Sequence, residues 1–169
     1  MAPRIDYAKL VPCAEVAGED AEDQALLREL IDRGRSYLSS FEWCRDIIEC
    51  HLGDIAVGGV VAVLLMKIEP AHDDVPEWHW VVVGDLPPAY IAADDAPNSA
   101  AALDAYIGEM QQWIDAVKAG DPVDDLIPVE TSDGGESLEA RSELAHDLER
   151  RLRFLDREIL PFHGEDLRE

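Results

Sequence analysis

Apolar residues recur at helical spacing in three long stretches of the chain. In each stretch they lie three and four positions apart, which brings them onto one face of an α-helix. The three stretches are residues 23–39, 98–119 and 137–160. In the middle stretch Asn98 or Ser99 is suited to cap the first turn, and Gly120 follows the last turn. These segments are therefore predicted to be amphipathic helices.

A fourth, shorter helix is predicted over Phe41 to Leu52. Gly53 follows this segment and is suited to end it. Its broad apolar face would consist of Phe41, Trp43, Cys44, Ile47, Ile48 and Leu52.

Three further segments are rich in β-branched or aromatic residues and predict strands. They are residues 55–68, 78–83 and 89–94. Gly58 and Gly59 predict a bulge or bend near the start of the first strand. Both faces of the second strand are largely apolar, so this strand is expected to be central and covered on both sides. One face carries Trp78, Trp80 and Val82, and the other carries His79, Val81 and Val83.

Together these elements predict a single α+β domain, with a three-stranded antiparallel β-meander packed against about four α-helices. The 169 residues suit one domain, which typically buries about 70% of its unfolded surface. We expect an irregular N-terminal arm over residues 1–22, the domain over 23–160 and a C-terminal tail over 161–169.

The string Gly84-Asp85-Leu86-Pro87-Pro88 after the second strand has two interpretations. Proline donates no backbone hydrogen bond, so strand pairing is expected to stop at or before Pro87, and Gly84 with Asp85 suits a turn. Alternatively, Asp85 is a general base or a metal ligand at a strand end. Because no histidine, serine or cysteine stands close to Asp85 in the sequence, the turn is preferred.

The charge balance changes the picture more than any motif does. The chain carries 37 acidic and 14 basic residues, for a net charge of -23. Such a field repels phosphate backbones and anionic lipid headgroups, so we expect neither direct nucleic-acid binding nor membrane-surface binding. A basic protein partner, or high solubility, fits this charge better. The opening residues lack the apolar core of a signal peptide, and the longest apolar run, residues 55–66, is shorter than the about 20 residues that span a bilayer.

Cysteine and histidine give no strong site signal. Cys13, Cys44 and Cys50 are an odd number without framework spacing, which is typical of reduced thiols in a cytoplasm. Zinc sites have paired ligands at short spacing, whereas Cys44, Cys50 and His51 are irregularly spaced, so buried structural cysteines are expected. His79 is interpreted as a hydrogen-bonded core residue. We expect no metal and no cofactor.

The acidic residues are concentrated in one part of the sequence. Residues 53–136 contain 17 acids and only two bases, whereas residues 137–169 contain nine acids and six arginines. A concentrated field of one sign steers a partner of the opposite sign. A solvated surface is the simpler interpretation of any single cluster, but the concentration favours a partner-binding role. The candidate partner-binding residues are Asp73, Asp74, Glu77, Asp94, Asp95, Asp121, Asp124 and Asp125.

Five segments carry a resemblance to a known family. They are "FEWCRDIIECHLGD", "DVPEWHWVVVGDLPPAYI", "ALDAYIGEMQQWIDAVKAG", "LIPVE" and "LERRLRFLDREIL", and they span roughly residues 41–160. In this arrangement the chain resembles small acidic bacterial immunity proteins of contact-dependent or polymorphic toxin systems. The resemblance implies a non-enzymatic protein that binds and blocks a toxin domain, often a basic nuclease. Two other hypotheses remain: a small hydrolase-like enzyme using Asp85 and a histidine, and an acidic adaptor in a larger complex.

Overall fold

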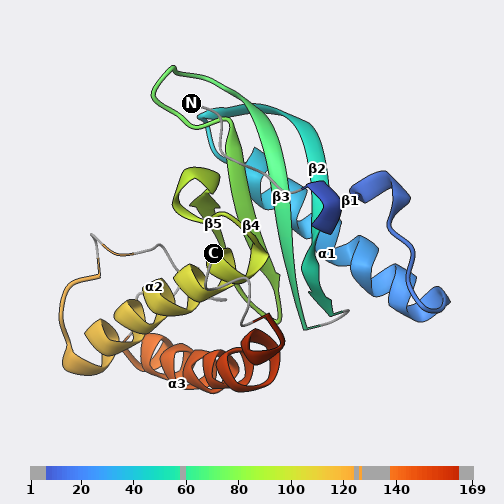
Figure 1. Ribbon diagram of the computed structural model, residues 1–169. Coiled ribbons are helices and arrows are strands. Elements are labelled where there is room, and N and C mark those ends of the chain that lie inside the picture. Colours follow the sequence, from blue (N-terminus) through green and yellow to red (C-terminus); the bar gives the residue numbers. More distant parts are fainter. Residues whose placement is uncertain (1–6, 58–59, 124–125, 127–137, 164–169) are drawn as a thin grey trace.

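The computed structural model describes residues 7–57, 60–123, 126 and 138–163. It is an α+β fold in which five antiparallel strands form one sheet in sequential order (Figure 1). The strands are β1 (Val11–Pro12), β2 (Cys44–Val57), β3 (Val61–Pro70), β4 (Trp78–Gly84) and β5 (Leu86–Ala92). The α-helices are α1 (Ala21–Ser39), α2 (Ser99–Ala119) and α3 (Leu138–Phe154).

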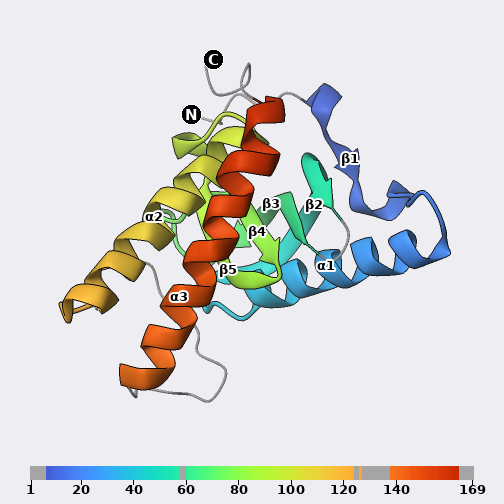
Figure 2. The same ribbon diagram turned by 90° about the horizontal axis from the view of Figure 1, so that it is seen from below.

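Helices cover both faces of the sheet. One core cluster lies between the sheet and α1, and a second lies between the opposite face and α2 with α3. Figure 2 shows α2 and α3 running beside each other, with α1 separate from them across the sheet. A salt bridge of 2.6 Å between Lys118 and Glu149 joins α2 to α3. Because both of its faces are covered, β4 is buried over its whole length, as its sequence predicts.

The three long helices predicted from apolar spacing are confirmed, with small differences at their ends. The side chain of Asn98 caps α2 by accepting a hydrogen bond from the backbone nitrogen of Ala101 over 2.8 Å. Gly120, with φ of 74°, ends α2 in the left-handed conformation that glycine favours. Beyond α3, the chain continues as a π-helical turn, η4 (Leu155–Ile159), and a 3₁₀ turn, η5 (Leu160–His163).

The predicted helix over Phe41 to Leu52 is wrong, because residues from Cys44 onward form β2. The pairing of β2 with β3 shifts register at three places along the strand. Each shift adds or omits a residue on one face, so the two-residue alternation of a strand is broken and the apolar positions imitate a helical stripe. The described residues therefore contain three α-helices instead of about four, and the sheet has five strands instead of three.

The single strand predicted over residues 55–68 is a hairpin instead. Its first residues finish β2 and the rest belong to β3, with Val57 paired to Val61 across the turn. The bulge or bend predicted at Gly58 and Gly59 lies outside the described residues. The N-terminal arm adds a further strand, since Val11 and Pro12 pair with β2.

The turn at Gly84 is confirmed, but pairing does not stop at the prolines. Gly84 has φ of 152°, which side chains disfavour, and it pairs with Leu86 across the turn. The ladder resumes at Ala89 after a register shift, so Pro87 and Pro88 lie within β5. Prolines are tolerated there because β5 is an edge strand and the shift leaves their positions unpaired.

Candidate functional site

One end of the sheet brings together segments that are distant in the sequence. At this end β2 begins, β3 ends, β4 begins and β5 ends (Figure 1). The strand register shows the alignment, because Cys44 pairs with Pro70 and His79 pairs with Ala92. The loops that follow these strand ends therefore lie close to one another.

Five of the eight candidate partner-binding acids belong to this end, and all five are exposed. Asp73, Asp74 and Glu77 lie in the connection between β3 and β4, and Asp94 and Asp95 lie in η3 (Ala93–Asp95), directly after β5. We call this set the acidic rim.

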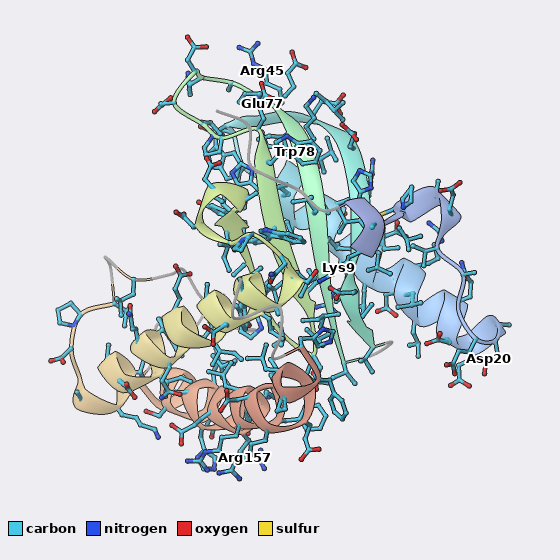
Figure 3. All side chains as sticks on the ribbon, in the orientation of Figure 1. Lys9, Asp20, Arg45, Glu77, Trp78 and Arg157 are labelled. Atoms are coloured by element: carbon cyan, nitrogen blue, oxygen red, sulfur yellow. The ribbon has the colours of Figure 1, made fainter. Side chains whose placement is uncertain are left out.

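The sheet end carries three more exposed acids that sequence reasoning did not select. They are Glu42, Asp46 and Glu69. Two cations accompany them: Arg45 is exposed and lies at the same end of the sheet as Glu77 (Figure 3), and the Lys67 ammonium stands 5.8 Å from the centre of the Trp78 ring. Acids thus outnumber bases here, and this end of the molecule has a negative local charge.

Asp121, one of the other three candidate acids, is not part of the acidic rim. Asp121 is exposed beyond the C-terminal end of α2, which points away from the β3–β4 connection in Figure 1. Asp124 and Asp125 lie outside the described residues. The structure therefore separates the predicted set into a group at the sheet end and Asp121 elsewhere.

An aromatic cluster lies beside the acidic rim on the α1 face of the sheet. Its members are Tyr37, Phe41, Trp43, His79 and Tyr90. Phe41 and Trp43 stack with ring centres 4.9 Å apart, and Tyr90 stands edge-on to both at 5.1 and 5.0 Å. Trp43 is held next to the β3–β4 connection, because its carbonyl accepts a hydrogen bond of 2.9 Å from the backbone of Ala71.

Four of the cluster's rings are only half-buried, while its histidine is buried. Tyr37, Phe41, Trp43 and Tyr90 remain partly open to solvent. His79 is 2% exposed, and its Nδ1 has no hydrogen-bond partner among the described residues. Burial lowers the pKa of His79 to about 4, and the negative charge of Asp94 opposes this shift in part. The expectation of a buried core histidine is confirmed, but hydrogen bonding at Nδ1 is not observed.

Sequence reasoning missed the aromatic cluster because it assigned Phe41 and Trp43 to the apolar face of a helix. The sequence signal that could have revealed the cluster is the number of aromatic residues near the ends of the predicted strands. Half-buried tyrosine and tryptophan are enriched where proteins recognise partners, and arginine stacks on their faces. Carboxylates beside them bind guanidinium and ammonium groups. This combination is suited to recognising a basic protein surface.

Asp85 lies at the opposite end of β4 and is 73% exposed. It lines a pocket of about 330 Å³ together with apolar residues and α3 side chains, and its Oδ2 lies 3.3 Å from Nε of Arg151. The lining residues are Val60, Asp85, Leu86, Asp147, Arg150, Arg151, Phe154 and Leu155. They include no histidine, so the structure does not bring Asp85 and a histidine together in this pocket.

The remaining histidines and the cysteines are dispersed. His51 is 3.2 Å from Glu49, His163 is 3.5 Å from Asp54, and His72 and His146 are exposed. No group of three or more histidine, cysteine or acidic side chains suited to a metal ion occurs in the described part of the chain. Cys44 is buried, as expected. Cys13 and Cys50, in contrast, are brought into direct contact.

Comparisons of the chain with protein-family models, with curated protein sequences and with solved structures gave no match. Among the helices that the structure describes, none has the length and hydropathy needed to cross a bilayer.

Proposed function

We propose that this protein is a cytoplasmic immunity protein, without enzymatic activity, that binds and neutralises a basic, nuclease-type bacterial toxin domain. The acidic rim and the aromatic cluster form its binding surface. The observation that carries this proposal is the position of five exposed carboxylates around partly open aromatic rings at one end of the sheet.

Charge supports a basic partner. The chain has a net charge of -23, so approach of a cationic protein is favoured from a distance. At the acidic rim, the toxin's lysine and arginine side chains, which normally bind nucleic-acid phosphates, would contact carboxylates instead. A nuclease whose cationic site is occupied in this way cannot bind its substrate.

The aromatic rings support a specific complex rather than a diffuse one. Long-range attraction raises the association rate, whereas buried aromatic contacts near the centre of an interface slow dissociation. Trp43 and Tyr90 offer such contacts because they pack edge-to-face against each other and remain partly open. We therefore assign steering to the acidic rim and anchoring to Trp43 and Tyr90.

The test is binding to the toxin domain encoded by the adjacent gene, measured as association and dissociation rates at several salt concentrations. The first variant replaces Asp73, Asp74 and Glu77 together by their amides. Association should slow at low salt, and the difference should shrink as the Debye length falls below about 8 Å. Toxin activity should be inhibited by the parent protein at stoichiometric concentration.

A matched control has the same change in net charge at another place. Glu22, Glu29 and Asp32 are exposed along α1, and Figure 3 shows Asp20, at the start of this helix, far from Glu77. The variant in which Glu22, Glu29 and Asp32 are replaced together by their amides should associate with the toxin nearly as fast as the parent. Trp43→Ala should instead accelerate dissociation. Equal slowing by both triple variants would remove the acidic rim from the interface, and absence of any toxin binding would contradict the proposed function.

A further inference from the structure

Cys13 and Cys50 face each other across the edge of the sheet. Val11 pairs with Leu52 and Pro12 pairs with His51, and this antiparallel register, continued by one residue, puts Cys13 opposite Cys50. Their sulfur atoms are 2.6 Å apart, about half an ångström longer than the ~2.05 Å bond of a disulfide. Cys13 itself begins the 3₁₀ turn η2 (Cys13–Glu15), directly after β1.

The surroundings make the two thiols unequal. The hydrogen bond from Cys13 and then the guanidinium of Arg35 lower the pKa of Cys50, and Arg28 acts in the same direction. The hydrogen bond to Cys50 and burial raise the pKa of Cys13. Cys13 is buried, whereas Cys50 is only half-buried. Cys50 is thus the thiol that is both more acidic and more accessible, which are the properties of a reactive cysteine.

The N-terminal arm is held in place independently of the sulfur atoms. On one side the arm pairs with β2. On the other side, the carbonyl of Val16 accepts a hydrogen bond of 3.0 Å from the side-chain amide of Gln24 in α1. The two cysteines are therefore presented to each other by backbone pairing and by helix contacts, so their reaction requires no large rearrangement.

We propose that Cys13 and Cys50 are a redox-active dithiol that a hydroperoxide oxidises to a disulfide. The Cys50 thiolate attacks the terminal oxygen of the hydroperoxide, a sulfur–oxygen bond forms, the oxygen–oxygen bond breaks, and the alcohol or water leaves with a proton. Cys13 then attacks the Cys50 sulfenic acid, the sulfur–sulfur bond forms, and hydroxide leaves with the Cys13 proton as water. Two thiols and one hydroperoxide give one disulfide, one alcohol and one water. A small dithiol then reduces the disulfide back to the two thiols by thiol–disulfide exchange and is itself oxidised to a disulfide.

Closing this bond fixes the N-terminal arm covalently to β2 and encloses α1 in a loop. The folded state should gain stability because the unfolded chain loses conformational freedom. The inference does not depend on the proposed function. It concerns the edge of β2 that pairs with β1, and the reaction needs no partner protein.

The primary experiment exposes the full-length parent protein to hydrogen peroxide and follows the three thiols by alkylation and mass spectrometry. Cys13 and Cys50 should become resistant to the alkylating reagent together, and the mass of the intact monomer should fall by that of two hydrogen atoms. Cys44 should still be alkylated and is the internal control. The melting temperature should rise by roughly 10 °C and return after treatment with dithiothreitol.

Variants identify the attacking thiol. In Cys13→Ser, a sulfenic-acid reagent should label Cys50 after peroxide treatment, whereas in Cys50→Ser it should leave Cys13 unlabelled. Arg35→Gln should slow oxidation several-fold and Arg35→Lys should restore most of the rate. The matched control is Arg33→Gln, at an exposed position of the same helix, which should oxidise at the parent's rate.

Several results would overturn the inference. They are retention of all three thiols at peroxide concentrations that oxidise free cysteine, disulfides formed only between two molecules, and equal oxidation of Cys44. If the parent protein forms the disulfide but Arg35→Gln oxidises at the same rate as the parent, activation of Cys50 by Arg35 is refuted.

Discussion

The indole nitrogen of Trp80 donates a hydrogen bond of 2.9 Å to the carbonyl oxygen of Ala96, inside the core between the sheet and α2. This bond links β4 to the segment that follows η3, and so it fixes the chain directly after Asp94 and Asp95. Trp80→Phe should lower the free energy of unfolding by about 2–3 kcal/mol, because packing is reduced and the buried carbonyl loses its partner. Urea denaturation measures the loss. The half-buried Trp43 provides a control, since Trp43→Phe should cost less, and equal losses would contradict this role for Trp80.

Acid should destabilise the protein through His79. Burial lowers the pKa of His79 to about 4, whereas the unfolded value is about 6.5. Between these values the unfolded chain binds a proton that the folded protein does not, so stability is intact above about pH 6.5 and falls as the pH approaches 4. The total loss should be about 3 kcal/mol.

The variant His79→Phe should show a smaller loss of stability over the same pH range, because it has no imidazole to protonate. Unfolding free energies of the parent and the variant, measured in urea across this range, provide the comparison. Parallel pH dependences for the two proteins would mean that other groups cause the acid sensitivity.

The two residues of the β4–β5 turn should respond differently to substitution. Gly84 has φ of 152°, and a side chain at this position would meet the backbone of Val60 and Val61. Gly84→Val should therefore cost at least about 1–3 kcal/mol. Asp85→Asn removes an exposed ion pair with Arg151 and should cost less than about 1 kcal/mol. Thermal denaturation compares the two variants, and loss of biological activity in a folded Asp85→Asn protein would favour the hydrolase-like hypothesis.

Tyr106 should stabilise the contact between α2 and β5. Its hydroxyl donates a hydrogen bond of 2.6 Å to the carbonyl of Pro87, and the ring is fully buried. Tyr106→Phe preserves the ring but leaves the carbonyl unpaired, so it should cost about 1–2 kcal/mol. Tyr90→Phe, in the half-buried aromatic cluster, is the corresponding control and should cost less in chemical denaturation.

The elements with an uninterrupted period were predictable from the sequence. The helix over residues 98–119 has a constant apolar face and recognisable caps, and β4 is a short run of aromatic and β-branched residues that ends at Gly84. β2 was not predictable in this way because its three register shifts destroy the alternation. β1 was missed because two residues form no pattern of their own, and their pairing depends on β2 being a strand.

The candidate site was predictable only as composition. Asp73 and Asp94 stand 21 positions apart in the sequence, and their association follows from the pairing of β4 with β5. Likewise Cys13 and Cys50 have no recognisable spacing, and only the pairing of β1 with β2 brings them together. Contacts of this kind follow from strand pairing, which brings together segments that have no characteristic spacing in the sequence.

The sequential strand order has a consequence for how the chain folds. From β2 to β5, each strand pairs with the next one along the chain, so these hairpins close short loops at little entropic cost and should form early. β1 must close across the whole of α1 to reach β2. We expect it to dock after the transition state, so that substitutions at Val11 accelerate unfolding while leaving the folding rate nearly unchanged.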